Sequence, residues 1–358
     1  MEEVTILTGG AGFIGTRLSR SLVGGDRRIV AIDNLHPQVH RQGLAPSDYP
    51  KDVELVVADI TDRSFWDDFL TKYYPVEVVH LAAETGTGQS LSESTRHAHV
   101  NVVGTAQMVD AFSRSKRIPR HIVLASSRAV YGEGAWQTNS GDVFYPPLRS
   151  HDALVLGKWN IVGPNGEIAV PLPHDASRLF PKPASIYGAT KLTQENIVEC
   201  WAAAMAVSAT IFRFQNVYGP GQSPFNAYTG IITLFHRIAG GGGTIEVYED
   251  GGVGRDFVYI DDVVAACSSA IEKPFDGIRR IDVGTGTVTT IAEAAAIIAA
   301  LHGAPEPIIS GKFRNGDIRW AVADTNNLEN ALGVRCNTAF ASVGAARVGE
   351  WLGAQRVI

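Results

Sequence analysis

The segment Thr8-Gly9-Gly10-Ala11-Gly12-Phe13-Ile14-Gly15 decides the fold, because it joins the short apolar run 4–7 to a helical pattern. Glycines stand at positions 9, 12 and 15. In a turn between a strand and a helix, this spacing lets backbone N–H groups at the helix N-terminus meet a pyrophosphate. The last glycine allows the helix to pack closely on the strand. We therefore expect the first turn of a dinucleotide-binding unit.

An acidic residue supports the same interpretation. Asp33 ends the second apolar run, 18 residues after Gly15, where a carboxylate can accept hydrogen bonds from both ribose hydroxyls. It would repel a 2′-phosphate, and the two residues after it supply no cation, so we expect NAD rather than NADP. Asp59 and Ile60, after the third run, could bracket the adenine, although a surface-loop aspartate is the alternative. The cofactor-binding residues expected here are Gly9, Gly12, Phe13, Ile14, Gly15, Asp33, Asn34, Asp59 and Ile60.

Short β-branched runs alternate with longer helical patterns. The runs are residues 4–7, 29–32, 53–57, 76–81, 122–125 and 210–214. Their continuous apolar character is typical of strands in a parallel sheet that helices cover on both faces. We therefore predict an α/β fold, a Rossmann-type doubly wound parallel sheet, with a smaller, interleaved C-terminal substrate-binding domain.

The domain boundary is expected near Tyr218, where the sequence changes to Gly219-Pro220-Gly221. Residues 258–260 and 281–283 resemble further sheet elements that return to the first domain. We therefore assign residues 1–218 and 254–284 to the NAD-binding domain, and 219–253 and 285–358 to the substrate domain. The proline-rich stretch 134–183 is long for a connection, which indicates an insertion near a site.

A tyrosine and a lysine stand four residues apart in a helical pattern. Tyr187 and Lys191 form this pair, and two serines, Ser126 and Ser127, follow the fifth run. A tyrosine with a pKa of about 10 is a poor base at neutral pH, but a lysine ammonium and a positive nicotinamide stabilise its phenolate. The spacing alone is common on helix surfaces. Together with the glycine segment, it predicts a catalytic site.

Composition narrows the classes of partner. The chain has 358 residues, a formal net charge of −6 and scattered basic residues, so we expect no nucleic-acid partner. Its three cysteines form no CxxC, which argues against disulfides and favours a cytoplasmic location. His97 and His99 have no further ligand at suitable spacing, so no metal is expected. A signal peptide and a bilayer-length apolar stretch are both missing, so we expect no membrane partner.

The motifs and their order resemble the extended short-chain dehydrogenase/reductase superfamily, specifically its NAD-dependent nucleotide-sugar epimerases and dehydratases. The resemblance covers nearly the whole chain. It implies that Tyr187 is the base, that Lys191 is its activator and ribose anchor, and that Ser127 contacts the substrate oxygen. It also adds Leu81, Ala82, Ala83 and Asn101 to the cofactor site. The other matching strings cover residues 80–83, 101–105, 126–132, 213–221, 255–259 and 316–317.

The loop after the fifth run separates the reaction types of this family. Its 4,6-dehydratases carry a Glu two positions after this serine, but here Arg128 and Ala129 follow Ser127. Neither residue can serve as the acid and base of an elimination. Inversion at C4 through a 4-keto sugar needs neither, so a nucleotide-sugar 4-epimerase is expected. Three strings, over residues 80–90, 126–134 and 228–231, resemble the branch that acts on dTDP-L-rhamnose.

The resemblance also implies the substrate contacts. Asn216, Arg255 and Arg314 would bind the diphosphate of a dTDP- or UDP-sugar, and Tyr248 would stack on the base. Near the sugar, the expected residues are Glu84, Thr85, Ser127 and Arg128. Glu84 would contact sugar hydroxyls or simply buttress its loop.

Other functions remain open at this stage. A 4-ketoreductase would use the same three catalytic residues, and a 4,6-dehydratase would require another acid and base. An NAD-binding redox sensor would keep the glycine segment but would not need Ser127, Tyr187 and Lys191 together. A homodimer is expected, because members of this superfamily commonly pair through helices equivalent to residues 95–115 and 187–204.

Overall fold

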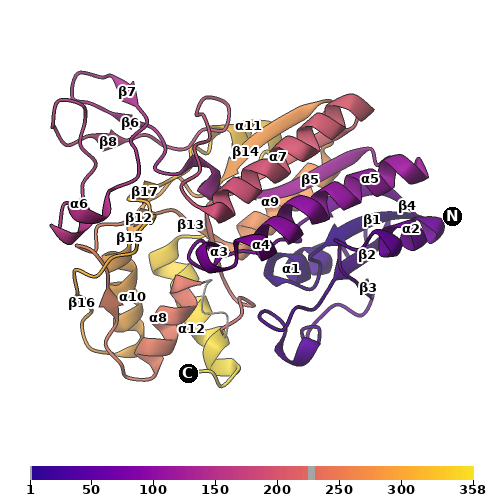
Figure 1. Cartoon of the computed structure of the whole chain (residues 1–358). Helices are drawn as coiled ribbons and strands as arrows, with labels where there is room; N and C mark the ends of the chain where they lie inside the picture. Colours follow the sequence, from indigo (N-terminus) through magenta and orange to yellow (C-terminus); the bar gives the residue numbers. More distant parts are fainter. Residues whose placement is uncertain (1, 225–229) are drawn as a thin grey trace.

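The computed structural model describes residues 2–224 and 230–358, so Tyr228 and Thr229 of the predicted string lie outside the described residues. Its centre is a seven-stranded parallel sheet in the order β3-β2-β1-β4-β5-β9-β14 (Figure 1). The strand order reverses between β1 and β4, which opens a crevice at the carboxyl ends of the strands. The strands are β1 (Glu2–Thr8), β2 (Arg28–Asp33), β3 (Glu54–Val57), β4 (Tyr73–His80), β5 (His121–Ser127), β9 (Ser208–Phe214) and β14 (Ile278–Val283).

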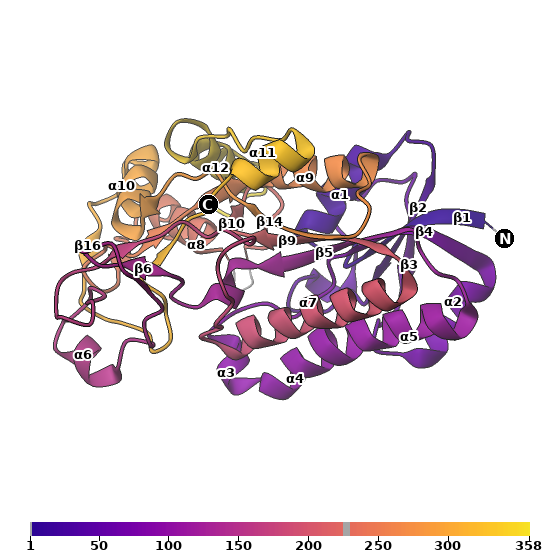
Figure 2. The same ribbon diagram turned by 90° about the horizontal axis from the view of Figure 1, so that it is seen from above.

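Helices cover both faces of this sheet, which confirms the doubly wound α/β fold (Figure 2). Strand residues point alternately to the two faces, so Ile6 packs in one core cluster and Leu7 in the other. The strands are apolar throughout because both faces are buried. One layer contains α2 (Arg63–Lys72), α5 (Thr105–Ser115) and α7 (Ile186–Met205); the other contains α1 (Phe13–Leu22), α9 (Ile260–Glu272) and α11 (Asn326–Leu332).

Each of the six expected runs forms a strand of this sheet, and residues 281–283 form its edge as part of β14. Residues 258–260 overlap a further strand that returns to the predicted first domain, but in a separate sheet. β13 (Phe257–Tyr259) pairs with β10 (Asn216–Tyr218) in a separate two-stranded sheet. The chain passes the end of the large sheet after Phe214, and there β13 is its neighbour. This pairing brings the chain near Asn216 beside the chain near Arg255.

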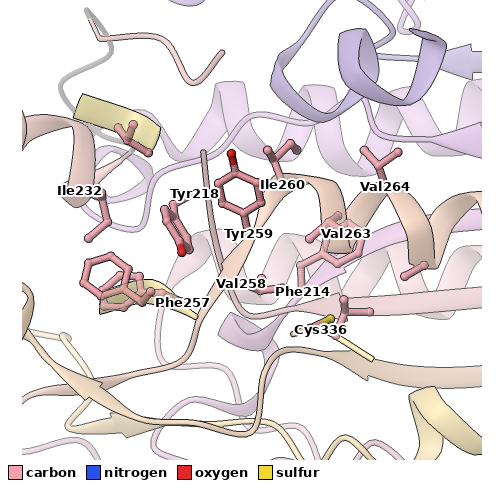
Figure 3. Packing of buried hydrophobic residues seen from close by; sticks show 14 of the residues in the cluster. Phe214, Tyr218, Ile232, Phe257, Val258, Tyr259, Ile260, Val263, Val264 and Cys336 are labelled. Carbon is pink, nitrogen blue, oxygen red and sulfur yellow. The ribbon is translucent and has the colours of Figure 1, made fainter. Parts of the chain in front are cut away.

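The C-terminal part contains three further helices and short strands. The helices are α8 (Ile231–Gly240), α10 (Ile291–His302) and α12 (Ala345–Ala354); the strands are β11 (Glu246–Val247), β12 (Gly254–Arg255), β15 (Thr289–Thr290), β16 (Ile308–Ile309) and β17 (Trp320–Ala321). One core runs without a break from Phe214 through Tyr218 and Phe257 to Ile232 (Figure 3). Helix α11 packs against β14 although it lies in the predicted substrate domain. The domain boundaries stay a prediction.

The stretch 134–183 forms a small subdomain of its own. Its sheet has the order β7-β6-β8, with β6 (Trp136–Gln137), β7 (Val143–Phe144) and β8 (Val170–Pro171), and its helix is α6 (His151–Val155). Trp136 packs there with Ile161 and Ala169. The stretch returns to the rest of the molecule at His174, which bridges to Ala323. Figure 1 shows this subdomain projecting beyond the carboxyl end of the sheet.

A composite helix leads into α5. It consists of α3 (Gln89–Ser92), α4 (Ser94–Ala98) and a π-helical stretch, His99–Gly104. His97 is buried, and its Nδ1 lies 3.1 Å from the carbonyl oxygen of Glu93. The described residues contain no group of three or more His, Cys, Asp or Glu that could hold a metal ion. Within the same described part, no helix is long and apolar enough to span a bilayer.

Candidate active site

The glycine segment forms the turn between β1 and α1. Gly9 has φ +69°, and a Cβ there would lie 2.7 Å from the Ala82 backbone nitrogen. A Cβ on Gly15 would lie 2.2 Å from the carbonyl oxygen of Gly9. No side chain caps the N-terminus of α1, where Gly12 is the N-cap residue. The N–H groups of its first turn are therefore available to an anion, which fits the pyrophosphate of NAD.

Asp33 lies at the end of β2 and faces this turn. Its carboxylate accepts hydrogen bonds from the backbone nitrogens of Ala11 (3.1 Å) and Leu35 (2.9 Å). A carboxylate can accept about four hydrogen bonds, so these two leave capacity for ribose hydroxyls. On the next strand end, Asp59 accepts a bond from the Asn34 amide (3.1 Å). The structure thus brings together the predicted residues of the adenosine end.

The loop after β4 is fixed by Asn101, which is fully buried. Its Oδ1 accepts a bond from the Glu84 backbone nitrogen (2.7 Å), and its Nδ2 donates to the Glu84 carbonyl (3.0 Å) and to Thr190 Oγ1 (2.9 Å). The Glu84 carboxylate pairs with Arg96 of α4 (2.9 Å). This pairing favours the buttressing role that we considered for Glu84. Thr85 follows in the same loop and is partly exposed.

Ser127, Tyr187 and Lys191 meet at the carboxyl end of the sheet. Ser127 is the last residue of β5, and the other two lie in the first turns of α7. Burial raises the pKa of Tyr187, whereas a hydrogen bond with the Ser127 side chain and the cation of Arg128 lower it. Burial lowers the pKa of Lys191 to about 7, although the charge of Glu195 opposes this shift. The protonation states of Tyr187 and Lys191 therefore depend on the charges and hydrogen-bond partners placed beside them.

Sequence reasoning missed a buried ion pair next to these residues. Glu195 is one turn after Lys191, and its carboxylate binds the Arg213 guanidinium through two hydrogen bonds of 3.0 and 2.7 Å. Ser126 also donates to Glu195. The i,i+4 spacing from Lys191 was a signal, but the partner on β9 was not visible in the sequence. This pair anchors α7 to two central strands.

Cations gather on the substrate side of the site. Arg128 donates from Nε to Asn216 Oδ1 (2.7 Å). Burial and the charge of Arg255 lower the pKa of Arg128 to about 9, so the two guanidinium groups act on each other. Arg255 is buried and pairs with Asp317 (2.8 Å). Two cations and an amide at one place suit an anionic group such as a diphosphate.

Two hollows adjoin these residues. The first is lined by Thr87, Arg128, Ala129, Gly132, Ala184, Ser185, Gly316, Asp317 and Ile318. The second is lined by Asn216, Val217, Tyr218, Gln222, Gly230, Ile231, Ile232 and Phe257. Arg128 and Asn216 join the two. Of the predicted substrate-binding residues, Arg128 therefore lines the first hollow and Asn216 the second, and their hydrogen bond connects the two.

Tyr248 and Arg314 lie against each other, with the guanidinium carbon 5.3 Å from the ring centroid. The neighbouring Phe313 packs on Trp159 of the insertion, with ring centroids 6.2 Å apart. The sequence predicted that Tyr248 and Arg314 contact the nucleotide, but it did not indicate that the insertion packs beside them.

Fold and site together define an NAD-binding enzyme of the nucleotide-sugar epimerase class. Residues 5–153 and 159–284 match the model of the NAD dependent epimerase/dehydratase family, and the chain belongs to this family. Its NAD cofactor and its nucleotide-sugar epimerase class are thereby confirmed.

Individual relatives show which members of the family the chain is similar to. The chain is 48% identical to dTDP-L-rhamnose 4-epimerase of Burkholderia thailandensis, over 89% of this chain and 86% of the relative. It is 29% identical to UDP-glucose 4-epimerase of Mycolicibacterium smegmatis, over 97% of both chains. The crystal structure of Thermus thermophilus UDP-glucose 4-epimerase with NAD superposes with a TM-score of 0.75 at 25% identity, over 98% of this chain and 99% of that one.

Proposed function

We propose that the protein inverts the configuration at C4 of a dTDP-linked 6-deoxy-L-hexose and interconverts dTDP-L-rhamnose and dTDP-6-deoxy-L-talose. The observation that carries this proposal is the meeting of Ser127, Tyr187 and Lys191 beside Arg128 and Ala129. The choice of sugar rests on the similarity to the Burkholderia enzyme.

In this mechanism Tyr187 is the base. Its phenolate takes the proton of the sugar O4 hydroxyl, while Ser127 holds the same oxygen by a hydrogen bond. Lys191 stabilises the phenolate by its charge and anchors the cofactor ribose. When bound, NAD supplies the acceptor that takes hydride from C4 and returns it to the opposite face of the turned 4-keto sugar. Tyr187 then gives its proton back to O4, so the reaction is redox-neutral.

Elimination lacks its proton carriers at this site. Ala129 has no ionisable group, and Arg128 remains a cation at neutral pH because its pKa is lowered only to about 9. A dehydratase must remove the C5 proton and protonate the departing oxygen, and neither residue can do so. The C6 position of the substrate therefore stays untouched.

The remaining contacts hold the nucleoside diphosphate. Arg128, Arg255 and Asn216 would bind the diphosphate oxygens with guanidinium and amide N–H groups. Tyr248 would stack on the pyrimidine base, and Arg314, whose guanidinium lies against the Tyr248 ring, would bind the diphosphate from beside it. Fixing the diphosphate lets the sugar turn while its 4-keto oxygen stays near Tyr187.

We also propose that the protein is a cytoplasmic homodimer. The three cysteines, at positions 200, 267 and 336, are free thiols, which suits a reducing compartment. Leu91 of α3, Val103 of the π-helical stretch and Met205 of α7 have 64%, 39% and 38% of their surface accessible. Exposed apolar side chains on these helical segments suit a two-fold helix-to-helix contact.

The test of the proposed function is incubation of the purified protein with a panel of dTDP-, UDP- and GDP-sugars, followed by NMR of the C4 configuration. We expect inversion of dTDP-L-rhamnose without added NADH. A product that forms only with added NADH would show a 4-ketoreductase instead. A stable 4-keto-6-deoxy product would show a dehydratase, and no conversion of any sugar would favour the redox sensor.

A further inference from the structure

A chain of buried hydrogen bonds begins at the amino group of Lys191. Its Nζ donates to Oε1 of Gln194, three residues along α7 and on the same helix face. Gln194 has no accessible surface and Lys191 has 3%. An amide that accepts from a buried ammonium has its orientation fixed, because its Nε2 must then point away from the lysine.

The chain continues from this amide into the sheet. Gln194 Nε2 donates to Thr105 Oγ1 (2.8 Å), and the Thr105 hydroxyl donates to the Asn101 carbonyl (2.7 Å). His80 lies between two threonines, with Nε2 2.9 Å from Thr105 Oγ1 and Nδ1 2.6 Å from Thr8 Oγ1. Burial and the charge of Lys191 lower the pKa of His80 to about 3, so this imidazole is neutral.

The Thr105 hydroxyl donates to the Asn101 carbonyl, so its oxygen accepts from Gln194 Nε2. His80 Nε2 lies 2.9 Å from this oxygen and 3.3 Å from Gln194 Nε2, and the tautomer of the imidazole decides which ring nitrogen carries the proton. Its Nδ1 shares a hydrogen bond with the Thr8 hydroxyl, whose oxygen accepts from the Ala82 backbone nitrogen (3.3 Å). Thr8 directly precedes the glycine segment. The catalytic ammonium is thus connected, bond by bond, to the strand ends that shape the NAD site.

We propose that Gln194 is a positioning residue for the epimerisation, which holds the Lys191 ammonium in register with the dinucleotide-binding turn. This inference rests on the role proposed above for Lys191. A neutral amide suits the position: it satisfies one of the three N–H donors and leaves two for the cofactor. An apolar side chain would leave that donor unpaired in the interior.

The other titratable groups around Lys191 do not orient its ammonium. Glu195, on the same helix, is engaged by Arg213 and Ser126. His80, from β4, is neutral. Arg128, from the turn after β5, points toward Asn216. The hydrogen bond that orients the ammonium in this structure is therefore the one to Gln194.

The test compares Gln194→Leu with Gln194→Glu. Leucine removes the acceptor, whereas glutamate adds an anion beside the ammonium. Loss of the Lys191 proton sets the alkaline limb of the pH profile of kcat, because the phenolate then loses its cation. We expect leucine to shift that limb down and glutamate to shift it up, each by about one pH unit. The affinity of the apo-protein for NAD should fall about tenfold in the leucine variant, because an ammonium that Gln194 no longer orients would lose one hydrogen bond to the cofactor, worth about 1.4 kcal/mol.

Two further variants complete the experiment. Asn196→Ala, an exposed amide of the same helix, should match the wild type in both readouts. Unchanged limbs and NAD affinity in both Gln194 variants, or shifts in the same direction, would overturn the proposal. If leucine prevents folding, the upward shift in the glutamate variant decides alone. Lys191→Met separates the two claims. Normal turnover of this variant would contradict the proposed role of the lysine. If Lys191→Met is inactive while both Gln194 variants keep the wild-type pH profile and NAD affinity, only the inference about Gln194 fails.

Discussion

Lys191 lies in the interior, where burial of its charged ammonium lowers the free energy of unfolding. An ammonium prefers water, and burial lowers its pKa from 10.5 to about 7. Between these two values the unfolded chain binds the proton and the folded apo-protein releases it. The free energy of unfolding therefore rises with pH across this window, and below about pH 7 the full penalty is present. In the proposed mechanism, bound NAD would remove part of this penalty by giving the ammonium new hydrogen-bond partners.

Lys191→Met should stabilise the apo-protein, because it keeps the length of the side chain and removes the buried charge. We expect the Tm to rise by about 2 °C or more at pH 6, which corresponds to roughly 1 kcal/mol for a chain of this size. The gain should shrink toward pH 10. Thermal unfolding without cofactor across this pH range measures it, and a gain that grows with pH would contradict the assignment of the buried cation.

Tyr187→Phe removes the base and little else. We expect turnover to fall on the order of 10³-fold, the usual contribution of a positioned general base, with Tm and bound NAD unchanged. Tyr74→Phe is the matched control, since that phenol donates to the Ile118 carbonyl outside the site. Near-normal turnover of the Tyr187 variant would refute the mechanism.

At the scale of elements, the insertion is tied to the nucleotide side of the site. Arg149 lies between β7 and α6, and its guanidinium binds Glu249 through two bonds of 2.7 and 2.9 Å. It also donates to the Asp317 carbonyl (2.8 Å). Glu249 adjoins Tyr248, and Asp317 pairs with Arg255. The insertion therefore fixes the loops that carry the proposed nucleotide contacts.

Arg149→Lys tests this link, because lysine keeps the charge but lacks the planar fork. We expect the KM for the nucleotide sugar to rise about tenfold, which corresponds to loss of about one charge-assisted hydrogen bond, with kcat nearly unchanged. Arg178→Lys is the control, because the Arg178 side chain is 79% exposed and its ion pair contributes little. Equal KM values for the two variants would contradict the link.

The strands were the most predictable elements. A parallel strand covered on both faces must be apolar over its whole length, so runs such as residues 29–32 and 122–125 can be recognised as strands from the local sequence alone. The pairing of β13 with β10 was not predictable, because a three-residue strand carries no sign of its partner. The π-helical stretch before α5 likewise leaves no mark in the apolar periodicity.

The same difference holds within the site. The glycine turn and the pair Tyr187 and Lys191 have fixed spacings, because one turn or one helix face sets their geometry. The bonds between Arg149 and Glu249 join residues 100 positions apart, and only the folded chain brings them together. The role of Gln194 was hidden for another reason, since a buried amide and an exposed one look alike in a sequence.

At the scale of the whole molecule, the two predicted domains share one hydrophobic core. Phe214 of the large sheet and Ile232 of α8 belong to the same cluster (Figure 3). A continuous core argues against free hinge motion between the parts. The proposed nucleotide contacts of the C-terminal part, Tyr248 and Arg314, are therefore held at a fixed distance from Tyr187, which suits a sugar that turns while its nucleotide stays bound.

The proposed dimer adds a prediction at this scale. At micromolar concentration, light scattering should give twice the mass of the chain, and Val103→Glu should give a monomer, because a charge would be buried in the contact. Val57→Glu, at a 62% exposed position on the edge strand β3, is the control and should remain a dimer. A monomeric wild type would contradict the proposal.

The fate of the hydrogen at C4 tests the central claim most directly. dTDP-L-rhamnose carrying deuterium at C4 is incubated with the enzyme and an excess of unlabelled NAD, and the products are followed by NMR. The account predicts dTDP-6-deoxy-L-talose that retains its deuterium at C4, because hydride leaves and returns within one bound complex. Loss of the label to the added NAD would contradict it and would show net oxidation instead of epimerisation.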